Sequence, residues 1–144
     1  MEQIYNAILA RLQKTVPCLK WIDLDTGQLD DYAQRPPVAF PCLLIDIELT
    51  DCQDLYPGVQ LCNAILGIRI AQNPPASRTA GLTPKKIRQT ELQRYQLVED
   101  VYRALQSWEN GLFNPPSRIN QKRENRKDGL FVCRINFATM FKDT

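Results

Sequence analysis

The sequence of 144 residues contains no histidine. Histidine is the usual general base near neutral pH and the commonest metal ligand, so its absence removes both roles. Glycine-rich phosphate-binding motifs and the G-x-S-x-G nucleophile motif are also missing. Two carboxylate pairs, Asp23 with Asp25 and Asp46 with Glu48, fit a solvated strand face better than a pair of catalytic acids. The chain is therefore predicted not to be an enzyme and to bind no cofactor.

Long apolar runs are missing as well. No stretch approaches the roughly 18 apolar residues that a membrane-spanning helix needs. The segment Met1–Lys14 carries charges throughout, unlike the apolar core of a signal peptide. The net charge of +2 gives no global field toward nucleic acid or a membrane. We expect one domain over residues 1–144, synthesised in the cytoplasm, with no membrane partner and no specific nucleic acid.

The cysteines are Cys18, Cys42, Cys52, Cys62 and Cys133. They form no C-x-x-C pair, and without histidine they do not match a metal site. Their odd number argues against a framework made only of disulfides. Free cysteine behaves as a small core hydrophobe, so we expect reduced, structural thiols, with Cys62 and Cys133 facing the core.

The centre of the fold is predicted to be an antiparallel hairpin. Its strands are Phe40–Asp51 and Val59–Asn73, and Cys52–Gly58 connects them. The first strand alternates apolar and polar residues, which indicates one buried face. The second is apolar on both faces, which is typical of a strand in the middle of a sheet or under a second layer. The sequence Tyr56-Pro57-Gly58 matches a type II turn.

The remaining elements follow from periodicity and turn residues. An apolar stripe with helical spacing predicts a helix over Met1–Leu12. A second helix starts either at Thr83-Pro84 or at the capping box of Thr90, and it ends at Asn110-Gly111. The other predicted segments are a strand Cys18–Leu24, loops Asp25–Pro37 and Gln72–Thr83, and a final hairpin of Ser117–Asn125 and Leu130–Phe141 around the turn Arg126–Gly129.

These elements predict an α+β fold with the order α-β-β-β-α-β-β. About five strands form a mainly antiparallel sheet, and the two helices cover one or both of its faces. The strand Ser117–Asn125 is polar apart from Ile119, which is typical of a sheet edge guarded by charge.

Charge is separated along the chain. Residues Asp23–Asp54 contain eight acids and one base, Arg78–Arg94 contain five bases and one acid, and Arg118–Asp128 contain five bases and two acids. Opposite patches suit a molecule that meets its own copies head to tail, although solvated charged loops explain the same pattern equally well. Nucleic acid is a weaker alternative, since the basic hairpin has no interleaved aromatic residue.

The candidate assembly surface consists of the charged residues in these patches and in the two segments expected to be mobile, Gln72–Arg88 and the turn Arg123–Gly129. Its members are Arg78, Lys85, Lys86, Arg88, Arg118, Lys122, Arg123, Arg126, Lys127, Asp30, Asp31, Asp51 and Asp54.

One family shows a similar order of elements. Here Ile22-Asp23-Leu24 is followed by Thr26-Gly27-Gln28-Leu29 and by the run Phe40–Ile47, in a D-x-x-x-G-Q-L then P-x-L-x-I-D pattern. With a long helix and a closing hairpin after it, the whole chain resembles the tail-terminator, or tail-completion, proteins of long-tailed bacteriophages and prophages, such as minor tail protein U.

The resemblance implies structural work rather than chemistry. Such proteins form a ring, commonly a hexamer, on the last ring of tail-tube protein. The ring stops tube growth and offers a surface to the head-tail connector protein. The expected partners are thus copies of the chain, the tube protein and the connector, and the expected locations are the host cytoplasm during assembly and then the virion tail. The alternatives are another neck or connector component of the head-tail junction and a generic intracellular protein-interaction module.

Overall fold

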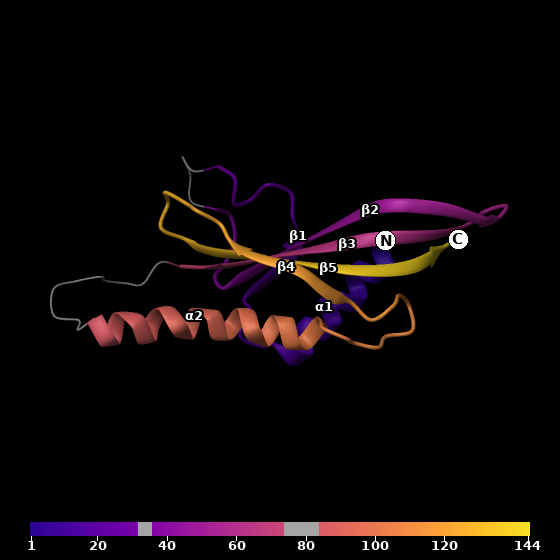
Figure 1. The fold of residues 1–144 in the computed structure, drawn as a ribbon. Coiled ribbons are helices and arrows are strands. Elements are labelled where there is room, and N and C mark those ends of the chain that lie inside the picture. The colour runs from indigo at the N-terminus through magenta and orange to yellow at the C-terminus, as the bar shows by residue number, and fades with distance from the viewer. Residues whose placement is uncertain (32–35, 74–83) are drawn as a thin grey trace.

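The computed structural model describes residues 1–31, 36–73 and 84–144. The expected order of two helices and five strands is confirmed (Figure 1). The predicted loop at Gln72–Thr83 lies almost wholly outside the described residues. The elements are α1 (Glu2–Thr15), β1 (Trp21–Leu24), β2 (Cys42–Tyr56), β3 (Val59–Gln72), α2 (Pro84–Leu105), β4 (Ser117–Arg123) and β5 (Phe131–Asp143).

The strands form one sheet with the order β1-β2-β3-β5-β4. Only β1 and β2 run parallel, and the other neighbours are antiparallel, so the sheet is mixed but mainly antiparallel. The strand β3 lies at its centre. This position explains why its sequence is apolar on both faces, because a central strand is covered above and below.

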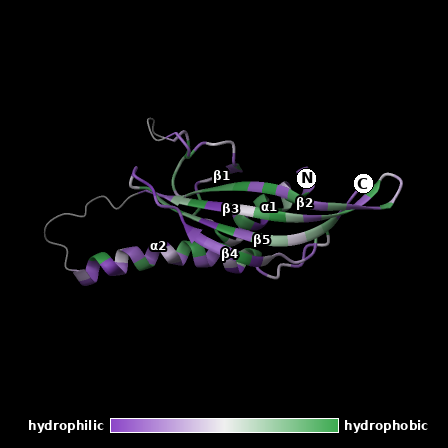
Figure 2. Ribbon diagram, turned by 45° about the horizontal axis from the view of Figure 1, so that its top comes forward, coloured by the Kyte–Doolittle hydropathy of each residue, from purple (hydrophilic) through white to green (hydrophobic). Residues whose placement is uncertain are grey.

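Both helices lie on the same face of the sheet (Figure 1). From α1 the side chains of Ile4, Ile8 and Leu12 point into the main core, where they meet the apolar faces of β2, β3 and β5. The apolar stripe of α2 closes the same core from Leu97 to Leu105. In Figure 2, hydrophobic residues are frequent on α1 and along the central strands, and hydrophilic ones are frequent at the start of α2.

The start of α2 matches one of the two expected starts, and its end differs from the expected one. The helix begins at Pro84, so the capping-box start is wrong; Thr90 lies inside the helix and its hydroxyl donates to the carbonyl of Lys86. The helix ends at Leu105, not at Asn110-Gly111. Ser107 has a φ of 58° and donates its backbone N–H to the carbonyl of Pro116, which turns the chain toward β4.

The first strand is shorter than predicted, and its faces differ from the alternation in the sequence, which predicts Leu19 and Trp21 on one face and Ile22 and Leu24 nearer the other. It covers Trp21–Leu24 rather than Cys18–Leu24. Leu19 and Ile22 pack against the main core, whereas Trp21 and Leu24 are exposed. Leu19 precedes the strand, so the two-residue alternation that grouped it with Trp21 does not apply to it.

A smaller apolar cluster covers the other face at one end of the sheet. Leu29 and Phe40, from the segment between β1 and β2, lie on Leu44, Ala71 and Val132. This segment is thus a partial second layer over the face that the helices leave open.

At the opposite end, β2 and β3 continue past the helices as a projecting arm, which we call the distal hairpin, residues 49–60 (Figure 1). The predicted connector Cys52–Gly58 is wrong as a loop, because β2 stays paired as far as Tyr56. A two-residue turn of Pro57 and Gly58 closes the arm, and Gly58 has the positive φ, 82°, that the third position of a type II turn requires. A bulge at Thr50 interrupts the register.

The cysteines divide into two groups. Cys42, Cys62 and Cys133 are buried, as expected, and none of the five forms a disulfide. Cys18 and Cys52 are exposed, so for these two the expectation of a core position is wrong. Burial raises the pKa of the Cys42 thiol to about 11 and also raises the pKa of Cys133.

This division predicts the reactivity of the thiols. At pH 8 a polar alkylating reagent is expected to modify Cys18 and Cys52 within minutes in the native protein, because their exposed thiols are accessible to the reagent. The three buried thiols are expected to react only after unfolding in guanidinium. Intact-mass spectrometry counts the added groups. Native modification of Cys42 or Cys133 at the same rate would contradict their burial.

Candidate functional site

The acidic residues of the candidate assembly surface lie in two places. Asp51 and Asp54 are exposed on the distal hairpin of β2. Asp30 and Asp31 follow β1 on the segment that covers the open face of the sheet, and Asp30 is held there by an ion pair. The predicted acidic surface is therefore split between the two ends of the molecule.

The basic residues lie on α2, on β4 and on the turn after β4. Lys85, Lys86 and Arg88 are exposed on the first turns of α2, and Lys127 is exposed on the β4–β5 turn. Arg78 lies outside the described residues. The other four, Arg118, Lys122, Arg123 and Arg126, make the specific contacts described below.

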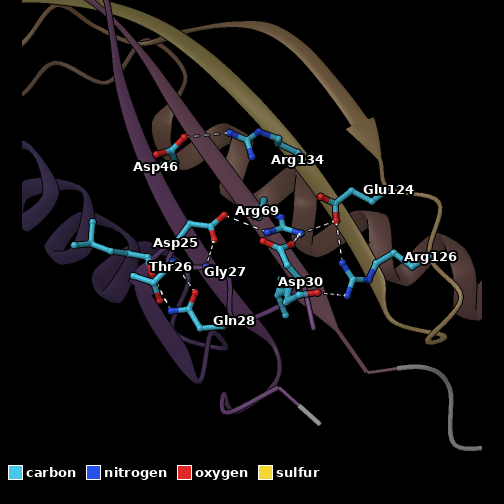
Figure 3. A network of polar contacts seen from close by, with 12 residues as sticks. Asp25, Thr26, Gly27, Gln28, Asp30, Asp46, Arg69, Glu124, Arg126 and Arg134 are labelled. Carbon is cyan, nitrogen blue, oxygen red and sulfur yellow. Dashed lines mark hydrogen bonds and ion pairs between the residues drawn. The ribbon is translucent and has the colours of Figure 1, made fainter. Parts of the chain in front are cut away.

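Sequence reasoning gave no special role to Arg69, yet this residue organises the open face of the sheet (Figure 3). Arg69 is buried near the end of β3. Its guanidinium contacts Asp25 at 3.2 Å, Asp30 at 3.1 Å and Glu124 at 3.0 Å. One cation thus joins β3 to the segment after β1 and to the end of β4. The interpretation of Asp25 as a solvated carboxylate is wrong, because its side chain is only 13% exposed.

Arg69 is buried, and the neighbouring carboxylates compensate for the cost of burying its charge. Burial alone would lower the pKa of its guanidinium, but hydrogen bonds and charge attraction from Glu124 and Asp25 outweigh burial, and the pKa is raised. Arg69 therefore stays charged. Its Nε is the single buried side-chain nitrogen or oxygen without a hydrogen bond among residues 1–31, 36–73 and 84–144. Such an atom costs about 1–3 kcal/mol, which the three ion pairs offset.

The β4–β5 turn is anchored to the same network by Arg126. Its side chain is only 2% exposed. It pairs with Asp128 at 2.6 Å and Glu124 at 3.3 Å, and it donates to the backbone carbonyl of Leu29. The expectation that the turn Arg123–Gly129 lacks a hold on the body is therefore wrong. Ion pairs hold the turn in place, and counting apolar residues along the sequence cannot detect them.

A second ion pair crosses the sheet and joins β5 to β2. Arg134 of β5 reaches over β3 and pairs with Asp46 of β2 at 3.4 Å. It passes above Gly67, where a Cβ atom would collide with the guanidinium. A side chain at position 67 would therefore displace the end of the Arg134 side chain.

The bases of β4 lie on both faces of the sheet. Arg118 stacks on the ring of Tyr102 and Arg123 on that of Phe131, both on the helix side. Arg123 also pairs with Glu91 at 3.8 Å. Lys122 is on the other face, where it lines a surface pocket of about 400 Å³ together with Arg69, Arg126 and Arg134. Sequence reasoning placed these bases correctly on an exposed strand.

Neither a metal-binding cluster nor a membrane-spanning helix is found in the part of the chain that the structure describes. Within the described ranges, no group of three or more His, Cys, Asp or Glu side chains could hold a metal ion. Among the same residues, no helix is both long and apolar enough to cross a membrane.

Comparison with known proteins adds a fold relationship. Neither a protein-family model nor a curated protein sequence matches the chain. Among solved structures, the fold is similar to that of a chain in the virion of a native gene transfer agent particle. The TM-score is 0.60 at 13% sequence identity, and the match covers 96% of this chain and 93% of that one. This likeness shows the fold.

The buried network predicts a large effect of replacing Arg69. In Arg69→Met the carboxylate of Asp25 loses its counter-ion in a partly buried site, and Glu124 keeps only its pair with Arg126, which together cost roughly 3–5 kcal/mol of unfolding free energy. Arg103→Met is the matched control, since Arg103 makes an exposed pair with Glu99 and such pairs contribute about 0.3–0.5 kcal/mol. Urea unfolding followed by circular dichroism measures both. Equal midpoints for the two variants would contradict the role given to Arg69.

The pair between Arg126 and Asp128 predicts that the stability of the fold depends on pH. Hydrogen bonds from Arg126 hold the pKa of Asp128 below its ordinary value. A depressed carboxyl pKa stabilises the fold above the ordinary value, and this contribution is lost as the pH falls through the folded-state pKa. Asp128→Asn is therefore expected to lower the melting temperature clearly at pH 7 and less at pH 3. Calorimetry at both pH values tests this; a deficit that grows on acidification would refute it.

Proposed function

We propose that the chain is a structural protein of a phage-like particle, and specifically a tail terminator. In this role about six copies close into a ring on the last ring of the tail tube. One face of the ring binds the tube protein and ends its growth, and the other receives the head-tail connector. The protein acts by shape and charge, not by catalysis.

The observation that carries the proposal is the extent of the fold match. The likeness to the gene transfer agent virion chain spans nearly the whole of both chains, so it is a match of complete architectures rather than of one common motif. The order of elements and the motifs from Asp23 to Asp46 resemble tail terminators independently of that comparison. Both lines point to the same class of particle.

The distribution of surface charge supports a ring. A closed ring of identical subunits uses two different patches on each subunit, because every contact joins the front of one copy to the back of the next. Here exposed acids lie along β2 and exposed bases along β4, at opposite sides of the sheet order. Complementary charges on separate patches favour such a contact over a two-fold one, in which like would meet like.

Deletion of the gene from its phage-like element tests the function. A tail terminator is expected to be needed for tails of one length, so its loss should give tubes that continue past the normal end and do not join heads. Negative-stain electron microscopy of lysates measures tube length, and expression of the chain in trans is expected to restore joined particles. Tails of normal length that merely fail to join heads would instead assign the chain to the neck.

A further inference from the structure

We propose that two open edges of the sheet pair with each other between neighbouring copies, so that the sheets of the ring form one continuous ribbon. The first is the acidic edge, Asp46–Tyr56 of β2, and the second is the basic edge, Ser117–Arg123 of β4. The inference rests on the proposed ring and adds to it the contact by which the subunits join.

The acidic edge is open because β1 is short. The parallel ladder between β1 and β2 ends at Leu24 and Ile45, and the Ile45 carbonyl accepts the last bond on that side, from the N–H of Asp25. Beyond this point, no strand in the described part of the chain lies beside β2 on the side away from β3. Backbone groups alternate in direction along a strand, so those of Ile47 and Leu49 also point away from β3, toward the open side.

The basic edge is open over its later part, whereas at its start the backbone N–H of Arg118 donates to the side-chain oxygen of Gln106. All residues of β4 are exposed, and β5 is its only neighbour in the sheet. Just past the strand, the N–H of Glu124 donates to the Val132 carbonyl, toward β5. By the same alternation, the backbone groups of Gln121 and Arg123 point outward. Unpaired edges of this kind are the surfaces that accept an added strand.

The direction of the strands agrees with a ring. The strand β5 runs parallel to β2, and β4 runs antiparallel to β5. Neighbours in a six-membered ring differ by a rotation of about 60°, which leaves corresponding strands pointing broadly the same way. The β4 strand of one copy therefore meets the β2 strand of the next in the antiparallel sense. Antiparallel pairing is the more stable arrangement per residue.

Charge selects this pairing over the alternatives. The acidic edge contains Asp46, Glu48, Asp51 and Asp54 and no base, and the basic edge contains Arg118, Lys122 and Arg123 and no acid. Joining two acidic edges or two basic edges would place like charges on adjacent strands, which is destabilising. Glu48 and Lys122 both lie on the face opposite the helices, so a joined sheet places them on the same face.

Replacement of Leu49 by proline tests the edge directly. Leu49→Pro removes an outward N–H and leaves the bonds of β2 to β3 in place, since proline is tolerated where an edge N–H faces outward. Leu49→Ala is the matched control, because it loses the side chain but keeps the N–H. Sedimentation velocity at low salt is expected to show a closed oligomer for wild type and Leu49→Ala, and monomer for Leu49→Pro with its circular dichroism spectrum unchanged.

An exchange of charge between the two edges is the second test of their pairing. Glu48→Lys and Lys122→Glu are each expected to lower the association constant at least tenfold, because each places like charges across the joint. The double variant Glu48→Lys with Lys122→Glu is expected to recover most of that loss. Recovery in the double variant distinguishes pairing of the two edges from independent damage at two sites.

The outcomes separate this inference from the proposed function. If Leu49→Pro assembles like wild type, or the double variant shows no recovery, the edge pairing is overturned while the ring remains. If the wild type stays monomeric at high concentration and low salt, the edge pairing is likewise overturned. In either case the deletion experiment on tail length still decides whether the chain is a tail terminator.

Discussion

The ion network around Arg69 is the interaction on which the shape of this molecule depends. The helices cover only one face of the sheet, and the other face is held by charge at one end (Figures 1 and 3). Arg69 joins the segment after β1 to the end of β4, and Arg126 extends the network to the following turn. A cation buried among three carboxylates tolerates little displacement, because each carboxylate left unpaired in a partly buried site is costly.

This constraint has consequences for the edges of the sheet. Asp25 directly follows β1, and its bond to Arg69 draws the chain away from β2 and over the open face. Because β1 ends there, the rest of β2 has β3 beside it on one side and no strand of the described residues on the other. At the other side, Glu124 directly follows β4 and is bound to the same guanidinium. The network thus ends both flanking strands, and it limits how much of each sheet edge is covered within one subunit.

The difference between the two faces of the sheet also indicates which surfaces can contact a partner. The helix face is filled by an apolar core and is unavailable to partners. The exposed charges gather on the sheet edges, on the start of α2 and on the distal hairpin. A stiff sheet with charged edges and a projecting arm loses little conformational entropy on association, so its contacts retain more of their free energy than those of a mobile loop.

Several features of the fold could be predicted from residues alone. The strand alternation of β2, the helical stripe of α1, the turn at Pro57-Gly58 and the terminal hairpin are local patterns, each spanning a few residues. The end of α2 at Leu105 was not predictable in this way, because the bond from Ser107 to Pro116 depends on where β4 begins. The length of the distal hairpin was also missed, since its polar residues pair through their backbone and leave no hydrophobic signal.

The sequence by itself determined the two helices, the central hairpin and the charged character of β4, because hydrophobic period and turn residues act between near neighbours. Only the tertiary structure decided which charges are surface and which are structural. Asp25, Asp30 and Glu124 lie 44, 39 and 55 positions from Arg69 in the chain, and Arg126 looks from the sequence like one more base in an exposed turn. The physical reason is that ion pairs carry no periodicity. Their partners are chosen by the folded sheet, which brings distant segments within about 3 Å of one guanidinium.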